Sequence, residues 1–295
     1  MLLPTGNVRT FARESPGHQL DAVLCSGGML GFPLVVQVQC ERQVRYKQVE
    51  FGLNLGHVLE GLASHLNSSE HFIFNWFPHT SNCLIQNASK TCLELQRAPR
   101  RCAWLRRALV EVSMWLVGSM AKFLAPALNR IVASLSWNRV VRVEENLRLR
   151  DCYEGVDRVW HEYAIPRHEA IYCLLRLKAE IEKLTCVGLS FGLEVNFVRE
   201  SAVWLSPTYR QDSYVIRVAC LKPFGRECGQ GDWLEVIDRL VGECGGRPNL
   251  FAGRRIVVAA AELAYPRLEE FRQLRRLWDP TNTFLTGRIN SSIFL

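Results

Sequence analysis

The sequence predicts an α+β fold. Short segments in which apolar and polar residues alternate, as in strands, lie among segments in which apolar residues recur every three or four positions, as in helices. The two kinds of segment do not form a regular strand–helix–strand repeat, which argues against a parallel sheet. With 48% hydrophobic and 22% charged residues among 295, the chain has the composition of an ordinary globular protein.

The first part of the chain is expected to be rich in strands, with one short helix from Gln19 to Leu24. A glycine-rich turn, residues 26–31, follows the helix; it could contact a cofactor phosphate or ring, or be an ordinary tight turn. Leu34 to Gln39 alternate as a strand that Pro33 bounds. The pattern then predicts a helix at 58–66, a strand at 70–77 and a polar loop or linker at 81–101.

The most apolar zone, residues 102–138, is expected to hold an amphipathic helix that ends before Pro126. Its uncharged run, residues 112–121, is much shorter than the roughly 20 residues that span a membrane. Two interpretations remain open. The helix packs on the protein core, or it lies at a membrane surface with its flanking basic residues near the lipid headgroups.

The second half continues the mixed pattern. One helix, residues 169–184, is expected to turn five apolar side chains inward: Ile171, Leu174, Leu175, Leu177 and Ile181. The other predicted segments are strands at 140–143, 193–198, 203–205 and 213–220, and helices at 233–244 and 263–278, the last of which is expected to begin near Pro266. Gly245 and Gly246 are a typical signal for the end of the first of these two helices.

The strand predicted at 193–198 carries two polar residues that are two positions apart. Successive side chains of a strand point to opposite faces, so Glu194 and Asn196 share one face while the apolar residues between them form the other. A carboxylate and an amide at one spot belong either to a solvated face or to a substrate pocket.

Several classes of function are disfavoured. The net charge of +7 is not accompanied by a basic–aromatic motif of nucleic-acid readers, so no nucleic-acid partner is expected, while weak attraction to an anionic membrane remains possible. The 11 cysteines form no Cys-x-x-Cys pair and the seven histidines are scattered, so no metal site is expected. The sequence contains no dinucleotide-binding, phosphate-loop or nucleophile-elbow motif. The amino terminus lacks a signal-peptide pattern and reads like the middle of a domain.

Short sequence blocks occur in a characteristic order along the chain. They are Phe74-Asn-Trp-Phe-Pro-His-Thr80, Glu162-Tyr-Ala-Ile-Pro-Arg-His168, Leu193-Glu-Val-Asn-Phe-Val198, Leu205-Ser-Pro207, Gly245-Gly-Arg-Pro-Asn249, Tyr265-Pro266 and Asp279-Pro-Thr-Asn-Thr-Phe-Leu285. Together they resemble the FAD-linked aldonolactone oxidases, which include the gulonolactone, arabinonolactone and galactonolactone oxidoreductases of the vanillyl-alcohol oxidase superfamily. The resemblance covers nearly the whole chain and implies a large antiparallel sheet with helices on one side.

The resemblance implies an FAD-dependent oxidoreductase that acts on the CH–OH group of a sugar 1,4-lactone, such as L-gulono- or D-arabinono-1,4-lactone, in ascorbate-type biosynthesis. Oxygen or another electron acceptor would reoxidise the flavin. The chain resembles the carboxy-terminal part of the family, so the main half of the FAD site is expected to be absent from it. The alternative is a catalytically inactive paralogue or fragment that acts as an interaction module. Association with the endoplasmic reticulum or another intracellular membrane is expected, with residues 102–138 as the candidate membrane contact.

The resemblance also assigns roles to individual residues. The family carries Glu-x-Arg on the strand at 193–198, where the pair holds the lactone near the flavin. Glu194 matches, and Asn196 stands where the family has arginine, so hydrogen bonding is kept but the fixed positive charge is lost. These two residues are the predicted catalytic pair. Ser206 and Arg247 join Glu194 as predicted substrate contacts.

The predicted flavin contacts are Gly28, Gly31, Asn249 and Ala252. After Arg-Pro the family continues His-Trp-x-Lys, whose lysine lies near the reduced flavin, whereas this chain has Asn-Leu-Phe-Ala at 249–252. The resemblance divides the chain into a remnant of the FAD-binding domain at 1–45, a substrate-binding domain at 46–264, and a C-terminal helix and tail at 265–295 that return toward the FAD domain. Without the rest of the FAD domain, Phe197 and Trp204 are expected to be exposed.

Overall fold

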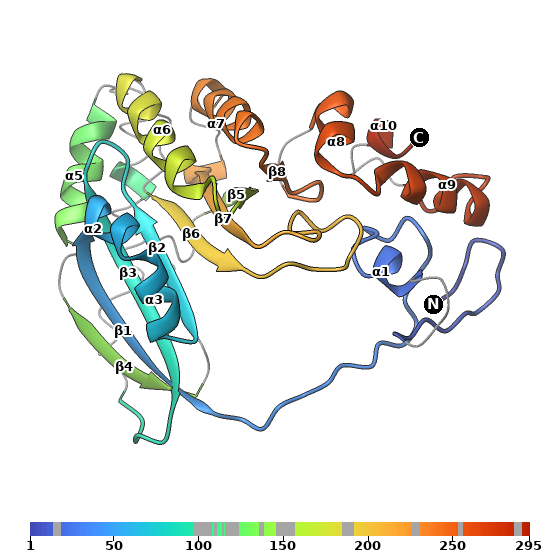
Figure 1. Ribbon diagram of the computed structural model, residues 1–295, viewed down its shortest axis with the longest axis horizontal. Helices are drawn as coiled ribbons and strands as arrows, with labels where there is room; N and C mark the ends of the chain where they lie inside the picture. Colours follow the sequence, from blue (N-terminus) through green and yellow to red (C-terminus); the bar gives the residue numbers. More distant parts are fainter. Residues whose placement is uncertain are drawn as a thin grey trace.

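The structure, a computed structural model, describes residues 1–13, 19–96, 108, 111–113, 115, 124–135, 139–145, 157–184, 192–225, 231–252, 256–285 and 291–295. Its main feature is an antiparallel sheet of eight described strands in the order β4-β1-β3-β2-β6-β7-β5-β8 (Figure 1). The strands are β1 Arg45–Asn54, β2 His71–Trp76, β3 Asn82–Thr91, β4 Val140–Glu144, β5 Arg158–Pro166, β6 Leu193–Val198, β7 Ser213–Leu221 and β8 Arg247–Pro248. The predicted α+β class is confirmed.

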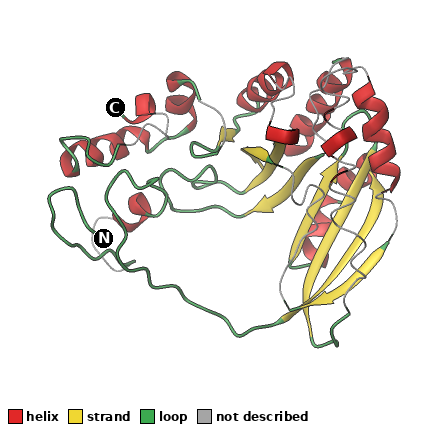
Figure 2. Ribbon diagram, turned by 180° about the vertical axis from the view of Figure 1, so that it is seen from behind, coloured by secondary structure: helices red, strands yellow, loops and turns green. Residues whose placement is uncertain are grey.

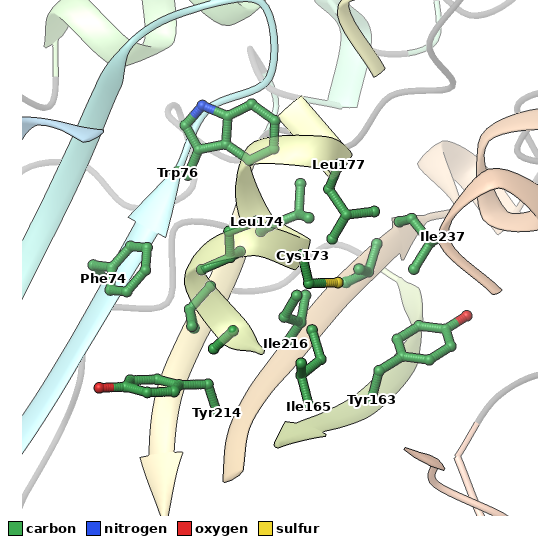
Figure 3. Close-up of a cluster of buried hydrophobic side chains, with 14 of the residues drawn as sticks. Phe74, Trp76, Tyr163, Ile165, Cys173, Leu174, Leu177, Tyr214, Ile216 and Ile237 are labelled. Atoms are coloured by element: carbon green, nitrogen blue, oxygen red, sulfur yellow. The ribbon is translucent and has the colours of Figure 1, made fainter. Parts of the chain in front are cut away.

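Most helices that pack on this sheet cover one face, as predicted, but the helix at Ala125–Leu135 (α5) packs on the other face, where its Ala133 meets Leu84, a neighbour of the core residues Cys83 and Ile85. The described helices are α1 Gln19–Val23, α2 Leu55–Glu60, α3 Leu62–Ser68, α5 Ala125–Leu135, α6 Ala170–Lys183, α7 Gly231–Glu243, α8 Val258–Ala264, α9 Leu268–Trp278 and α10 Ser291–Phe294. Side chains of α2, α3, α6 and α7 pack on one face of β2, β5, β6 and β7 and form the larger core. Figure 3 shows Phe74, Ile165 and Ile216 of the sheet meeting Leu174 and Leu177 of α6.

The inward face of α6 differs in part from the prediction. Leu174, Leu177 and Ile181 are buried as expected, but Ile171 and Leu175 are exposed by 43% and 50%. The buried stripe is completed instead by smaller side chains, among them Cys173. Residues 171 and 175 lie about 100° around the helix from positions 170 and 174, which is enough to turn them toward solvent.

A second core cluster joins the two ends of the chain. It is formed by residues of the amino-terminal segment, the 204–209 loop, the turn at 250 and the C-terminal helices: Ala22, Met29, Leu30, Trp204, Leu205, Tyr209, Leu250, Ala261, Tyr265, Leu268, Phe271, Trp278, Ile293 and Phe294. The backbone N–H of Trp204 donates to the carbonyl of Asp21 at 3.1 Å. Only 9% of the Trp204 surface is exposed, so the expectation that this residue is exposed is wrong. Phe197 is partly buried against the larger core. The predicted domain boundaries stay a prediction.

Residues 33–44 cross from the second core cluster to β1 as a long extended segment (Figures 1 and 2). The strand predicted at 34–39 is wrong, because in the described part of the chain this segment pairs with no other strand. Its apolar side chains are exposed: Leu34 by 51%, Val35 by 86%, Val36 by 71% and Val38 by 70%. A strand needs a partner for its backbone groups, and alternation alone cannot supply one.

Three further predictions are corrected. Residues 82–91, predicted as part of a loop, form the long strand β3 between β1 and β2. Residues 203–205, predicted as a strand, lie in turns. The helix predicted at 58–66 is divided at Gly61. The helix predicted to begin near Pro266 is confirmed as α9, which starts at Leu268, while residues 263 and 264 belong to the separate helix α8.

The apolar zone at 102–138 is described only in part, and the helix predicted before Pro126 falls mostly outside the described residues. Pro126 itself is the second residue of helix α5, a position where its missing N–H is not needed. Ala133 of α5 packs with Phe77 and Leu84, and Asn129 Nδ2 donates to the carbonyl of Pro78 at 3.3 Å. Among the described helices, none has the length and hydrophobicity needed to cross a lipid bilayer.

Candidate functional site

The face of the sheet opposite the larger core carries a row of polar side chains. The pairing registers join Asn75 of β2 to Glu194 of β6, Glu194 to Arg217 of β7, and Arg217 to Glu162 of β5. Directly paired residues of antiparallel strands point to the same face, so these four residues form one line across four strands. Figure 2 views the sheet from behind, on the side away from α2 and α3.

Three of these residues are linked by ion pairs. Arg217 Nε donates to Glu162 Oε1 at 2.8 Å, and Arg217 Nη1 donates to Glu194 Oε1 at 3.0 Å. The side chains remain partly open to solvent, with exposures of 38% for Arg217, 22% for Glu162 and 21% for Glu194. We call these three residues the acid–arginine cluster. The cluster combines oxygen acceptors with a charged N–H donor on an accessible surface, as a polar ligand requires.

An indole ring supports the arginine of the cluster. Trp160 lies two residues before Glu162 on β5 and so points to the same face. The Arg217 guanidinium carbon is 5.4 Å from the centroid of the Trp160 ring, and that of Arg158 is 4.9 Å from it. Contact with an aromatic face attracts a cation and restricts the positions that its side chain can take.

Asn249 closes one end of the cluster. Its backbone N–H donates to the Glu162 carbonyl at 2.8 Å, and its side-chain Nδ2 donates to Glu162 Oε2 at 2.9 Å. Its Oδ1 accepts the backbone N–H of Phe251 at 3.0 Å. Gly245, with φ of +66°, and Gly246 end helix α7 and lead the chain directly into β8, which fixes the position of Asn249. The predicted end of this helix is confirmed.

Asn196 shares a face with Glu194, as the alternation predicted, but lies one row away from the cluster. Its register partners are Ile73 of β2 and Val215 of β7, both apolar. The row continues through Ala164 to Arg247 of β8. The positive charge that the family pattern would place at position 196 is therefore not supplied by a direct cross-strand neighbour.

Arg247 is engaged within the protein. Its Nη1 donates to the Tyr209 carbonyl at 2.7 Å. Burial lowers the pKa of Arg247, and the nearby tyrosines oppose that effect. One of them, Tyr265, donates through its hydroxyl to the Pro248 carbonyl, and burial raises the pKa of this hydroxyl above its usual value. Arg247 thus joins the second core cluster to β8, and its role as a substrate contact stays a prediction.

The other predicted contacts are engaged in turns. Ser206 Oγ accepts the backbone N–H of Thr208 at 3.2 Å and lies 3.0 Å from its hydroxyl. A side chain added at Gly31, where φ is +148°, would lie 2.5 Å from the Leu2 carbonyl oxygen, so the packing of the chain itself requires this glycine. Gly28, with φ of +82°, faces open space, and the Ala252 N–H donates to the Asn249 carbonyl at 3.2 Å. The role of these four residues as flavin contacts stays a prediction.

The sequence contained a signal for two cluster residues that the site prediction missed. Arg217 is the charged residue of an otherwise apolar strand, Ser213 to Leu221, and Glu162 shares its strand face with Trp160 and Ala164. A charged residue at such a position requires a partner on its own face of the sheet, but which strand supplies that partner depends on the register.

A comparison with known protein families identifies the family of this chain. Residues 36–292 match the model of the D-arabinono-1,4-lactone oxidase family. The chain belongs to this family. Among its relatives, the bovine (Bos taurus) L-gulonolactone oxidase is 27% identical over 304 residues, and the L-gulonolactone oxidase of Scyliorhinus torazame is 28% identical over 276 residues. The resemblance found in the sequence blocks is confirmed, and the family is one of oxidoreductases.

The coverage of these relatives is uneven. The alignments span 100% and 90% of this chain, but 67% of the bovine protein and 61% of the Scyliorhinus protein. Among solved structures, the cholesterol oxidase of B. sterolicum matches with a TM-score of 0.72 at 10% identity, over 100% of this chain and 68% of that one. At this identity the match shows the fold, which is that of vanillyl-alcohol-oxidase-type flavoenzymes.

Proposed function

We propose that the chain binds a sugar 1,4-lactone on the polar face of its sheet, as the substrate-binding part of an FAD-linked oxidoreductase. The observation that carries the proposal is the acid–arginine cluster, whose Glu194 lies on the strand where the family pattern places its lactone contacts and whose side chains remain partly exposed. L-Gulono- and D-arabinono-1,4-lactone are the substrates that the family and relatives suggest.

The chemistry of the cluster suits such a ligand. A sugar lactone presents several hydroxyl donors and a carbonyl acceptor. The carboxylates of Glu194 and Glu162 accept hydrogen bonds, and the guanidinium of Arg217 donates them. Hydrogen bonds to charged groups contribute about 1.5–3 kcal/mol each, so two or three of them hold a small polar molecule.

The oxidant is expected to be FAD, because the family resemblance is to FAD-linked enzymes. The part of the reaction that the described residues support is recognition of the lactone. Of the predicted flavin contacts, Gly31 is required by the packing of the chain, and the Asn249 side chain binds Glu162 and the Phe251 N–H. Oxygen or another acceptor would then receive the electrons. Membrane association through residues 102–138 also stays a proposal.

The test is titration of the purified chain with L-gulono-1,4-lactone and with D-arabinono-1,4-lactone, followed by saturation-transfer NMR. We expect at least one lactone to bind without added flavin. We also expect the preparation to show no flavin absorbance, and no lactone oxidation. Failure of both lactones to bind would overturn the proposed function, whereas a yellow, lactone-reducible preparation would show that the chain alone holds a working flavin site.

A second candidate function is self-association, and the exposed segment at 33–44 favours it. An extended, apolar segment without a strand partner is a template for pairing with another chain, here a second copy. We expect light scattering to report a dimer that Val36→Lys converts to a monomer. Val257→Lys is the matched control, because Val257 is exposed by the same 71%. A wild-type chain that is monomeric at all concentrations would contradict this candidate.

A further inference from the structure

We propose that Arg217 supplies the positive charge of the lactone site, in place of the arginine that the family pattern puts at position 196. We further infer that the acid–arginine cluster selects neutral lactones over their open-chain carboxylate forms. Both inferences rest on the proposed lactone-binding function.

The first step is the position of Arg217. It is the direct register partner of Glu194, the residue that matches the family pattern, and its Nη1 lies 3.0 Å from Glu194 Oε1. Position 196 lies on the same face two residues further along β6, about 7 Å away. The side chain of Arg217 on β7 therefore contacts the same Glu194 carboxylate that an arginine at position 196 would contact.

The second step is the choice among the cations near this face. Arg247 lies in the row of Asn196, but Val215 and Ala164 separate the two, and its guanidinium is turned to the Tyr209 carbonyl. Arg158 contacts the Trp160 ring, and its register partner on β7 is Leu221, so strand pairing does not bring it to Glu194. Arg217, in contrast, is paired directly with Glu194.

The third step is the number of donors that Arg217 still offers. A guanidinium has five N–H groups, and the ion pairs to Glu162 and Glu194 use one at Nε and one at Nη1. The side chain is 38% exposed, so the other donors can reach a ligand. A lactone carbonyl or ring oxygen is an acceptor of the right kind, and the flanking carboxylates accept the adjacent hydroxyls.

The fourth step is the net charge of the cluster. The three residues of the acid–arginine cluster together carry one net negative charge, and Arg158 on the Trp160 ring is a further cation on this face. A neutral lactone is not repelled by this charge, but the carboxylate that forms when the lactone ring opens is repelled, because like charges at close range disfavour binding. The cluster thus distinguishes the two forms of one sugar acid.

The test measures binding of L-gulono-1,4-lactone and of sodium L-gulonate by calorimetry without flavin, so that binding is read independently of turnover. We expect wild type to bind the lactone about 10-fold or more tightly than gulonate. Arg217→Gln is expected to weaken lactone binding about 10- to 100-fold. Arg176→Gln is the matched control, because Arg176 is 37% exposed and forms a 2.8 Å pair with Glu243 on the helical side, and it is expected to bind as wild type does.

The outcomes separate the inference from the proposed function. If wild type binds lactone and a folded Arg217→Gln binds it equally well, Arg217 is not the cation of the site while the proposed function stands. If Arg217→Gln does not fold, the double variant Asn196→Arg/Arg217→Asn decides: retained lactone binding supports the inference and lost binding overturns it. Equal affinity for lactone and gulonate overturns the selectivity. No lactone binding by wild type overturns the proposed function, and both inferences with it.

Discussion

Glu194→Gln is expected to weaken lactone binding about 10- to 100-fold, the loss that follows when a charged acceptor of a ligand hydroxyl becomes a neutral one. The substitution keeps the size of the side chain. It removes one of the two carboxylates that hold Arg217, so the guanidinium is left with Glu162 and the Trp160 ring. The measurement is the dissociation constant of L-gulono-1,4-lactone, by calorimetry at constant ionic strength.

The stability of Glu194→Gln is expected to stay close to that of wild type. The pair with Arg217 is partly exposed, and such pairs contribute about 1 kcal/mol or less. Glu243→Gln, which removes the carboxylate from the Arg176 pair on the helical side, is the control and is expected to leave lactone binding unchanged. Lactone binding by Glu194→Gln within about twofold of wild type would show that this carboxylate does not touch the ligand.

The parts of the fold that the sequence predicted are those whose signal is local. The strand at 193–198 alternates because one of its faces is buried in the larger core. β3 was missed because it carries polar residues such as Gln86 and Asn87, which are typical of loops. Gln86 is buried in the sheet opposite Glu50 and Ile73. Its place between two neighbouring strands, and not its hydrophobicity, makes this segment a strand.

The candidate site could be predicted from local sequence patterns even less completely than the fold. That Glu194 and Asn196 share a face follows from the two-residue period of a strand. That Glu194 meets Arg217, and Arg217 meets Glu162, follows from the registers of three strands that are distant in sequence. If the pairing of any of these strands shifted by one residue, its charged side chain would point to the opposite face of the sheet. No local sequence pattern therefore predicts which charged residues meet.

Asp279→Ala is expected to lower the free energy of unfolding by about 3 kcal/mol, because it removes a buried charged acceptor from two backbone donors. Asp279 is fully buried at the end of α9. Its Oδ1 accepts the N–H of Thr283 and its Oδ2 accepts that of Phe284, each at 2.8 Å. Burial lowers the pKa of neighbouring Arg275, and the charge of Asp279 opposes this effect, so the variant also leaves a buried guanidinium with less compensation.

The block Asp279-Pro-Thr-Asn is therefore a structural turn, although it was one of the blocks that revealed the family. Asn282 takes a φ of +56° and accepts Arg275 Nη1 at 2.6 Å, which fastens the turn to α9. Urea unfolding followed by circular dichroism measures the effect. Asp212→Ala is the control, since Asp212 caps only the Glu200 N–H at an exposed site, and it is expected to cost about 1 kcal/mol or less. If the two variants lose equal stability, the buried carboxylate does not hold the C-terminal turn, and the shared block would need an explanation in substrate or cofactor binding instead.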